Sequence, residues 1–163
     1  MQYACCIATP AGPLTVVTDE RAVTRVKFGR QLPEGAATVD GAEQPEVLRR
    51  TVRELAEYFA GTRRVFTVAV APAGTPFQQE VWAALQRIPW GERRSYGQLA
   101  RAIGRPAACR AVGMANHRNP IAILIPCHRV VGADGSLTGY AGGLAIKAQL
   151  LALERPADVP TLF

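Results

Sequence analysis

The stretch Ile121-Ala122-Ile123-Leu124-Ile125-Pro126-Cys127-His128-Arg129-Val130-Val131 places a cysteine and a histidine side by side within an apolar run. The β-branched and leucine positions on either side of the pair are typical of short, buried, extended segments. Pro126 removes a backbone donor and fixes φ immediately before the cysteine. We therefore expect the thiol of Cys127 to be held in a fixed direction at the end of a rigid element.

Cys127 and His128 are candidates for a nucleophile and its base. A cysteine attacks as the thiolate, and its usual pKa of about 8.5 falls only beside a cation, a base or a helix start. The chain contains only one other histidine, His117, so histidine-assisted chemistry has few possible locations. The alternative is a small buried hydrophobic cysteine beside an ordinary core histidine. The pair alone does not decide between these interpretations.

The wider pattern around the pair resembles the active-site signature of a known family. The segments that carry it are Asn119-Pro120-Ile121, Pro126-Cys127-His128-Arg129-Val130 and Gly139-Tyr140-Ala141-Gly142-Gly143-Leu144. They are similar to those of the O6-alkylguanine-DNA alkyltransferases, also called methylated-DNA-protein-cysteine methyltransferases. The similarity runs without gaps from about Thr75 to Glu154, and the first seventy or so residues match only loosely.

The resemblance implies irreversible transfer of an alkyl group from O6 of guanine in double-stranded DNA, and also from O4 of thymine, to the sulfur of Cys127. His128 would take the thiol proton through a water molecule, Glu154 would orient the imidazole, and Tyr96 would donate to the leaving base. Asn119 would hold the backbone near the cysteine. Other interpretations are a helix-end carboxylate for Glu154, a turn former for Asn119 and a packing residue for Tyr96.

The same resemblance implies two further groups of residues. A base pocket would be lined by Asn116, Tyr140, Ala141 and Gly142. Contacts with DNA would come from Ser95, Arg110, Ala111, Gly113 and Arg118. A target atom inside a stacked duplex is out of reach of a thiol, so the nucleotide must be flipped out, and Arg110 would fill the gap. A simple phosphate contact is the alternative for Arg110.

Composition places the chain among globular proteins. Its 163 residues are 48% hydrophobic, and no run approaches the roughly 20 apolar residues of a membrane span. The start lacks a leader pattern, so we expect a cytoplasmic protein, associated with the nucleoid if it binds DNA. Cysteines at 5, 6, 109 and 127 are not spaced for zinc, and no histidine precedes His117. We expect no metal, no cofactor and no membrane partner.

The positive charge is concentrated in the half of the chain that carries Cys127. Residues 1–75 hold nine Lys/Arg and eight Asp/Glu, a balance of +1, whereas residues 76–163 hold ten and five, a balance of +5. This excess favours a polyanionic partner such as DNA, although a basic face is more often solvated surface. We expect a monomer, with clustering along DNA left open.

Hydrophobic periodicity predicts an α+β protein with a boundary in the Pro- and Gly-containing segment 71–74. Domain 1–74 is expected to hold antiparallel strands at 3–8, 14–18 and 22–28, a loop at 29–45, a helix at 46–60 and a strand at 65–70. On the third strand, residues 22, 24, 26 and 28 should share one face, opposite 23, 25 and 27. The family resemblance implies a ribonuclease H-like fold for this domain.

Domain 75–163 is predicted to be mainly helical and similar to a winged helix-turn-helix. Helices are expected at 76–88, 95–103, 106–116 and 144–154, the first two with capping boxes at Thr75/Gln78 and Ser95/Gln98. The last should carry Leu144, Leu151 and Ala148 inward before Pro156 stops it. By resemblance the helix at 106–116 enters the minor groove, but such helix pairs also occur in proteins that never touch DNA.

Two other functions compete with alkyl transfer. A non-catalytic relative could recognise alkylated bases without removing them, but the nucleophile is replaced in such proteins and Cys127 is present here. A cysteine hydrolase could use Cys127 and His128, but the sequence contains no separate oxyanion-hole motif.

Overall fold

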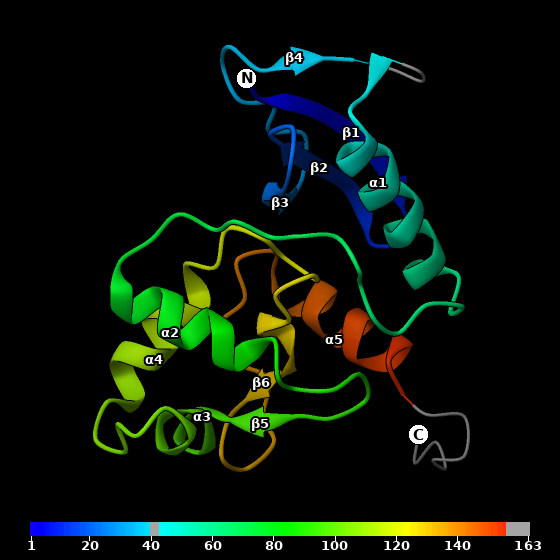
Figure 1. Ribbon diagram of the computed structural model, residues 1–163. Helices are drawn as coiled ribbons and strands as arrows, with labels where there is room; N and C mark the ends of the chain where they lie inside the picture. The colour runs from blue at the N-terminus through cyan, green and yellow to red at the C-terminus, as the bar shows by residue number, and fades with distance from the viewer. Residues whose placement is uncertain (40–42, 156–163) are drawn as a thin grey trace.

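The computed structural model describes residues 1–39 and 43–155 and has an α+β fold. A four-stranded sheet and the helix α1 (Glu46–Phe59) lie together at one end of the molecule, and the remaining helices gather at the other end (Figure 1). The segment around Cys127 lies within the helical part. The predicted α+β class is therefore confirmed.

The N-terminal sheet has the strand order β3-β2-β1-β4. Its strands are β1 (Tyr3–Thr9), β2 (Gly12–Thr18), β3 (Val23–Phe28) and β4 (Ala37–Thr38). The three predicted strands are present and pair in antiparallel fashion, whereas β4 pairs parallel to β1. The segment 29–45 was expected to be only a loop, and two residues of it extend the sheet.

The predicted alternation along β3 is wrong at its first residues. Val23 and Val26 are both buried, although an uninterrupted strand would place them on opposite faces. The register shifts at Val17/Thr18, because Val17 pairs with Arg25 while Thr18 pairs with Val23. The extra residue is a bulge, which turns Val23 toward the core.

The strand predicted at residues 65–70 does not form. Only Val70 makes a bridge, with Val23, and Val65 is 70% exposed. The backbone N–H of Thr67 donates to Glu54 Oε1 at 2.8 Å, and the carbonyl of Val65 accepts from the Arg63 guanidinium at 2.8 Å. Because side chains satisfy these backbone groups, the segment crosses to the second half without a ladder.

The helical half contains α2 (Pro76–Leu85), α3 (Tyr96–Ala102), α4 (Cys109–His117) and α5 (Leu144–Leu153). Both capping boxes form as predicted. The helix expected from residue 106 starts at Cys109, because residues 106–108 form a turn first. α3 and α4 are the two helices of the expected helix-turn-helix, and beside them β5 (Arg94–Ser95) pairs parallel with β6 (Val130–Val131).

The stretch Ile121–Ile125 is buried as predicted, but it is not extended. It runs through consecutive turns, and Ile123 has a φ of 72°, a left-handed conformation that β-branched residues rarely adopt. Ile121 makes a single parallel bridge with Val26 of β3. The side chain of Asn119 then holds the turns, because it accepts from the N–H of Ile121 and donates to the carbonyls of Ile121 and Ile125. Cys127 then begins a short 3-10 helix, η2 (Cys127–Arg129).

The inward face of α5 differs from the prediction. Leu144 is 47% exposed and Ala148 is exposed too, whereas Lys147, Leu150 and Leu151 are buried. The first two residues of the helix, Leu144 and Ala145, are both exposed, whereas Ile146 packs against the core. Pro156, which was expected to stop this helix, lies outside the described residues.

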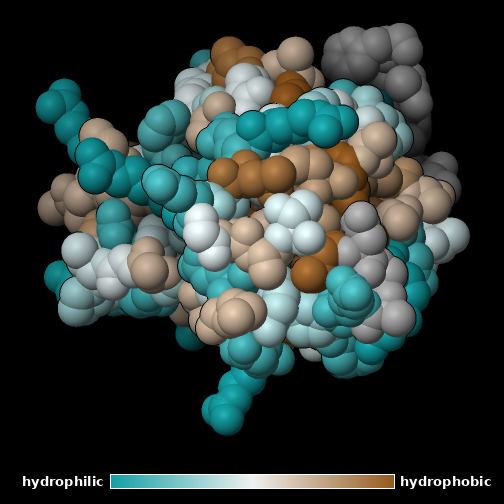
Figure 2. Space-filling view, turned by 90° about the horizontal axis from the view of Figure 1, so that it is seen from above, coloured by the Kyte–Doolittle hydropathy of each residue, from teal (hydrophilic) through white to brown (hydrophobic). Residues whose placement is uncertain are grey.

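No helix in the described part of the chain is long and apolar enough to cross a membrane. On the face seen from above, hydrophobic residues form small patches separated by hydrophilic ones (Figure 2). Small scattered patches are ordinary for a protein surface.

Trp82 connects α2 to α4. Its side chain is 2% exposed, and its indole N–H donates to the carbonyl oxygen of Ala115 at 2.8 Å. This bond holds the C-terminal turns of α4 near the segment that leads to Cys127. The packing of Trp82 therefore positions both the exposed face of α4 and the cysteine.

Trp82→Phe should lower the free energy of unfolding by about 1–3 kcal/mol, because it leaves the buried carbonyl of Ala115 without a donor. Urea denaturation followed by circular dichroism measures this. The matched control is Trp90→Phe, in which a half-buried ring 4.0 Å from the Arg64 guanidinium is exchanged; its loss should stay below about 1 kcal/mol. Equal losses in the two variants would contradict the role given to Trp82.

Candidate active site

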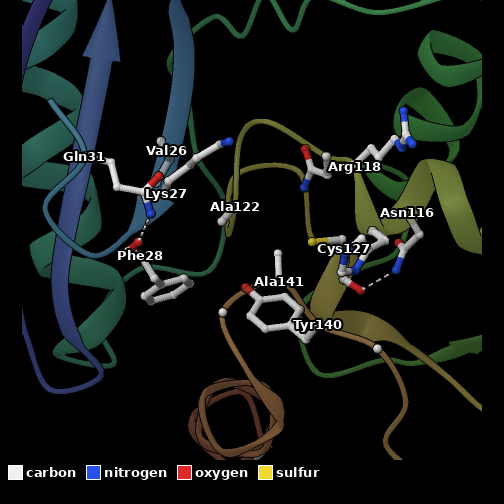
Figure 3. Close-up of a pocket in the computed structure, with 14 residues that line it drawn as sticks. Val26, Lys27, Phe28, Gln31, Asn116, Arg118, Ala122, Cys127, Tyr140 and Ala141 are labelled. Carbon is white, nitrogen blue, oxygen red and sulfur yellow. Dashed lines mark hydrogen bonds between the residues drawn. The ribbon is translucent and has the colours of Figure 1, made fainter. Parts of the chain in front are cut away.

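Cys127 borders a cavity of about 200 Å³ that is formed by both halves of the chain. The thiol residue is 6% exposed, and its sulfur points toward the space between Ala122 and Ala141 (Figure 3). The lining residues are Val26, Lys27, Phe28, Gln31, Asn116, His117, Arg118, Asn119, Ala122, Cys127, Gly139, Tyr140, Ala141 and Gly142. The wall that β3 contributes was not foreseen from the sequence.

Behind the cysteine, His128 and Glu154 form a buried pair. The Nε2 atom of His128 lies 2.7 Å from Glu154 Oε2, and the two side chains are 0% and 2% exposed. Arg129 donates to the same carboxylate from Nε at 2.8 Å and from Nη2 at 3.0 Å, and Tyr58 donates from its hydroxyl at 2.6 Å. Glu154, which sequence alone could not separate from an ordinary helix-end carboxylate, is thus the acceptor for three residues.

The charges of this pair follow from burial and hydrogen bonding. Burial acts to raise the pKa of Glu154, but hydrogen bonds from His128 and Arg129, the charge of Arg129 and that of His128 when it is protonated in acid outweigh burial and lower that pKa to about 2. Burial lowers the pKa of His128. The carboxylate is therefore ionised and the imidazole neutral at pH 7.

The tautomer of His128 follows from this charge state. An ionised carboxylate can only accept, so Nε2 carries the proton and Nδ1 has a free lone pair. Nδ1 is buried and has no hydrogen-bond partner among the residues that the structure describes. The atom of His128 that is not bound to Glu154 can therefore accept a proton.

The resting form of Cys127 is the neutral thiol. Burial raises its pKa, while a hydrogen bond from Asn119 and the charge of Lys147 act in the opposite direction. Asn116 also constrains the residue, because its side-chain amide donates to the Cys127 carbonyl at 3.3 Å. The thiolate must therefore form at the moment of reaction, by loss of the proton to a nearby base.

The loop at residues 139–142 closes one side of the cavity. The ring of Tyr140 meets the ring of Phe28 from β3 edge to face, with centroids 6.2 Å apart. Gly142 lies against both rings, and a Cβ there would be 2.9 Å from Tyr140 and 3.0 Å from Phe28. Residue 142 must therefore lack a side chain if this wall is to keep its shape. Ala141 presents only a methyl group to the cavity.

Some of the residues expected to contact DNA are exposed, and others have a role within the fold. Arg110, Ala111 and Arg118 are exposed on α4 and at its end, and Arg118 also lines the cavity. Ser95 accepts a hydrogen bond from the N–H of Gln98 as the cap of α3. Gly113 is half-buried next to the ring of Tyr96.

Tyr96 is placed outside the cavity wall. Its hydroxyl donates to the carbonyl of Thr138 at 3.3 Å and accepts from the Thr138 hydroxyl at 3.2 Å. It therefore contacts the loop that precedes Tyr140, and it is not among the residues that line the cavity.

Besides the wall contributed by β3, sequence reasoning missed Arg129, Lys147 and Tyr58. Arg129 was quoted within the motif without a role. Lys147 is fully buried and donates to the Thr138 carbonyl at 2.7 Å. It is the one charged residue in the described helix α5, which was a usable signal. Tyr58 has no local signal, because it precedes its partner by 96 residues.

The fold and the site define a class of protein in which a helix-turn-helix lies beside a buried cysteine nucleophile backed by a histidine and a carboxylate. No group of three or more His, Cys, Asp or Glu side chains within residues 1–39 and 43–155 is placed to hold a metal ion.

Comparison with known proteins identifies the family. Residues 76–156 match the model of the 6-O-methylguanine DNA methyltransferase DNA binding domain, and residues 3–72 match that of the ribonuclease-like domain. The chain belongs to the 6-O-methylguanine DNA methyltransferase family. The description of the second model agrees with the ribonuclease H-like fold that the sequence resemblance implied.

Individual relatives are similar over nearly the whole chain. The methylated-DNA–protein-cysteine methyltransferase of Methanosarcina acetivorans is 49% identical, over 93% of this chain and 97% of its own length. The constitutive enzyme of Bacillus subtilis is 46% identical, over 95% and 96%. The structure of the Mycobacterium tuberculosis protein OGT in complex with DNA has a TM-score of 0.85 and 45% identity, covering 96% of each chain.

The ionised Glu154 should make stability depend on acid. Its folded-state pKa of about 2 lies below the ordinary value of 4.5, so its contribution is complete above about pH 4.5 and is lost as the pH falls through about 2. The contribution is roughly 3 kcal/mol at 1.36 kcal/mol per pKa unit. Urea unfolding at a series of pH values should show a steeper loss for the wild type than for Glu154→Gln.

Two further results define that experiment. Glu154→Gln should also be less stable than the wild type at neutral pH, because the buried Arg129 loses its counter-charge. Glu46→Gln, which removes a carboxylate whose side chain is 75% exposed, is the control. If the wild type and Glu154→Gln lost stability with the same slope in acid, the assigned charge state would be wrong.

Proposed function

We propose that this protein repairs alkylated DNA by transferring the alkyl group from O6 of guanine to the sulfur of Cys127. The observation that carries the proposal is a cysteine that borders a cavity and is followed in η2 by His128, which is bound to the buried Glu154. The family and the DNA-bound M. tuberculosis relative support DNA as the partner. Alkylated guanine is the proposed substrate within that DNA, and the acting unit is a monomer.

The reaction is a displacement at the alkyl carbon. The sulfur of Cys127 attacks that carbon, a C–S bond forms, and the C–O bond to the purine breaks. The thiol proton passes to the free Nδ1 of His128, directly or through a water molecule, while Nε2 remains bound to Glu154. The imidazolium that forms is stabilised by the carboxylate, as in other cysteine and serine nucleophile systems.

The leaving purine requires a proton or a strong hydrogen bond as the C–O bond breaks. Tyr96 is the proposed donor. Its hydroxyl is bound to Thr138 in the present structure, so this role requires a flipped base to replace that contact. Thr138 lies directly before Gly139 on the cavity wall, which makes the exchange a local one.

Binding of duplex DNA is proposed to use the exposed face of α4. Arg110, Ala111 and Arg118 face solvent there, and small residues allow the helix backbone to approach a groove. The side chain of Arg110 would occupy the space that a flipped nucleotide leaves. Ser95 and Gly113, at the cap of α3 and beside Tyr96, would bring backbone groups near the phosphates.

The chain is proposed to divide into domains 1–74 and 75–163. The two family models, which match residues 3–72 and 76–156, support a boundary in this segment. The cavity nevertheless takes Phe28 from the first domain and Tyr140 from the second. The active unit is therefore the whole chain.

Each chain should accept one alkyl group and then be spent. The product is a thioether with a poor leaving group and no acidic proton, so we expect none of the cavity side chains, Lys27 and Tyr140 included, to displace the alkyl group from the sulfur. Intact-mass analysis after incubation with excess methylated duplex should show one added methyl group per chain, located on Cys127 by peptide mapping. Cys127→Ser should remove none. Repeated turnover would refute the proposal and favour a hydrolytic use of the cysteine.

Arg110→Ala should slow repair of duplex DNA more than reaction with free O6-benzylguanine, because only the duplex requires base flipping. A loss of roughly tenfold or more on duplex corresponds to about 1.4 kcal/mol. Rapid-quench measurement of transfer to Cys127 gives both rates. Arg53→Ala, which removes an exposed charge from α1, controls for net charge. Equal losses on duplex and free base would remove the flipping role.

A further inference from the structure

Tyr58 brings a group from the N-terminal half into the hydrogen-bond network of the active site. It lies on α1, is 1% exposed, and donates its hydroxyl to Glu154 Oε2 at 2.6 Å. The same oxygen accepts the bond from His128 Nε2 at 2.7 Å. The N-terminal half therefore contacts the carboxylate that orients the base.

The hydroxyl of Tyr58 is held in place from several sides. The ring packs against Phe59 with centroids 5.3 Å apart and against Phe66 at 5.6 Å. α1 itself is fixed on the sheet by Leu48 and Leu55, both fully buried. Moving the hydroxyl away from Glu154 would therefore disturb this packing.

Oε2 of Glu154 accepts from both Tyr58 and His128. The bond from Tyr58 therefore changes how strongly that oxygen interacts with His128. The Tyr58 hydroxyl withdraws negative charge from Oε2, so the carboxylate stabilises an imidazolium less strongly than it would alone. The other charged or titratable groups that face this pair are Arg129 and Cys127 on η2, Lys147 on α5 and Tyr140 on the adjoining loop. Arg129 and Lys147 also disfavour a charged His128. These four groups all come from the C-terminal half, whereas Tyr58 comes from the N-terminal half.

We propose that Tyr58 is a positioning residue for alkyl transfer, which fixes the Glu154 carboxylate and withdraws part of its charge so that His128 stays neutral until it accepts the thiol proton. This inference rests on the proposed function only for its catalytic consequence. The coupling from Tyr58 through Glu154 to His128 exists whether or not the substrate is alkylated DNA.

NMR titration of the two histidines tests the coupling without any DNA. In Tyr58→Phe, which keeps the ring and removes the hydroxyl, the titration midpoint of His128 should rise by about one pH unit, since a bond to a charged group is lost. His117, exposed on α4, is the internal reference and should not move. Tyr3→Phe is the matched control, because it removes an exposed hydroxyl that lies 3.4 Å from Glu20.

Replacement of Tyr58 by 3-fluorotyrosine gives the opposite change with almost no change in shape. The fluorine makes the phenol a stronger donor, so the titration midpoint of His128 should fall. If Tyr58→Phe does not fold, this substitution alone tests the coupling from Tyr58 to His128. Opposite shifts in the two proteins would support the proposal. A midpoint unchanged in folded Tyr58→Phe, or unchanged with 3-fluorotyrosine, would overturn it.

The pH profile of transfer to Cys127 then separates this inference from the proposed function. The acidic limb of the rate for methylated duplex should move upward in Tyr58→Phe and stay in place in Tyr3→Phe. If the wild type transfers no alkyl group at any pH, the proposed function fails, and the histidine titration still decides the coupling. If transfer occurs with the same profile in Tyr58→Phe as in the wild type, the positioning role fails and the proposed function stands.

Discussion

The arrangement of this protein depends on one buried negative charge. The carboxylate of Glu154 accepts hydrogen bonds from Tyr58 on α1 and from His128 and Arg129 on η2, while Glu154 itself follows the last turn of α5. An ionised group so deeply buried is tolerated only when its lone pairs are all used by donors. The hydrogen bonds around this charge therefore fix α1, η2 and the end of α5 relative to one another. Because Cys127 begins η2, they also fix the position of the thiol.

Features that depend on neighbouring residues were predictable from the sequence. The capping boxes at Thr75 and Ser95 need only residues one turn apart, and the burial of the stretch around Cys127 follows from its apolar composition. The errors arose where a distant or side-chain partner replaced a backbone one. Glu54 takes the N–H of Thr67, so no strand forms there, and Asn119 folds the isoleucine-rich stretch into turns.

The family motif was sufficient to predict three residues of the candidate site, namely Cys127, His128 and Glu154. The contributions of the N-terminal half were not, since neither Tyr58 nor Phe28 differs in local pattern from an ordinary core aromatic residue. Buried cations were also missed, because composition alone assigns Arg129 and Lys147 to the surface. Their burial is explained by the Glu154 carboxylate beside Arg129 and the Thr138 carbonyl beside Lys147.

The protonated, enclosed state of Cys127 has a consequence for the lifetime of the protein before it meets its substrate. Oxidants such as peroxides react with exposed thiolates much faster than with buried thiols, and the first product, a sulfenic acid, would leave the sulfur unable to accept an alkyl group. Cys109, exposed on α4, has no such shelter. Burial keeps the Cys127 thiol protonated, so a base is needed for the transfer reaction. The same burial slows oxidation of the sulfur before the protein meets its substrate.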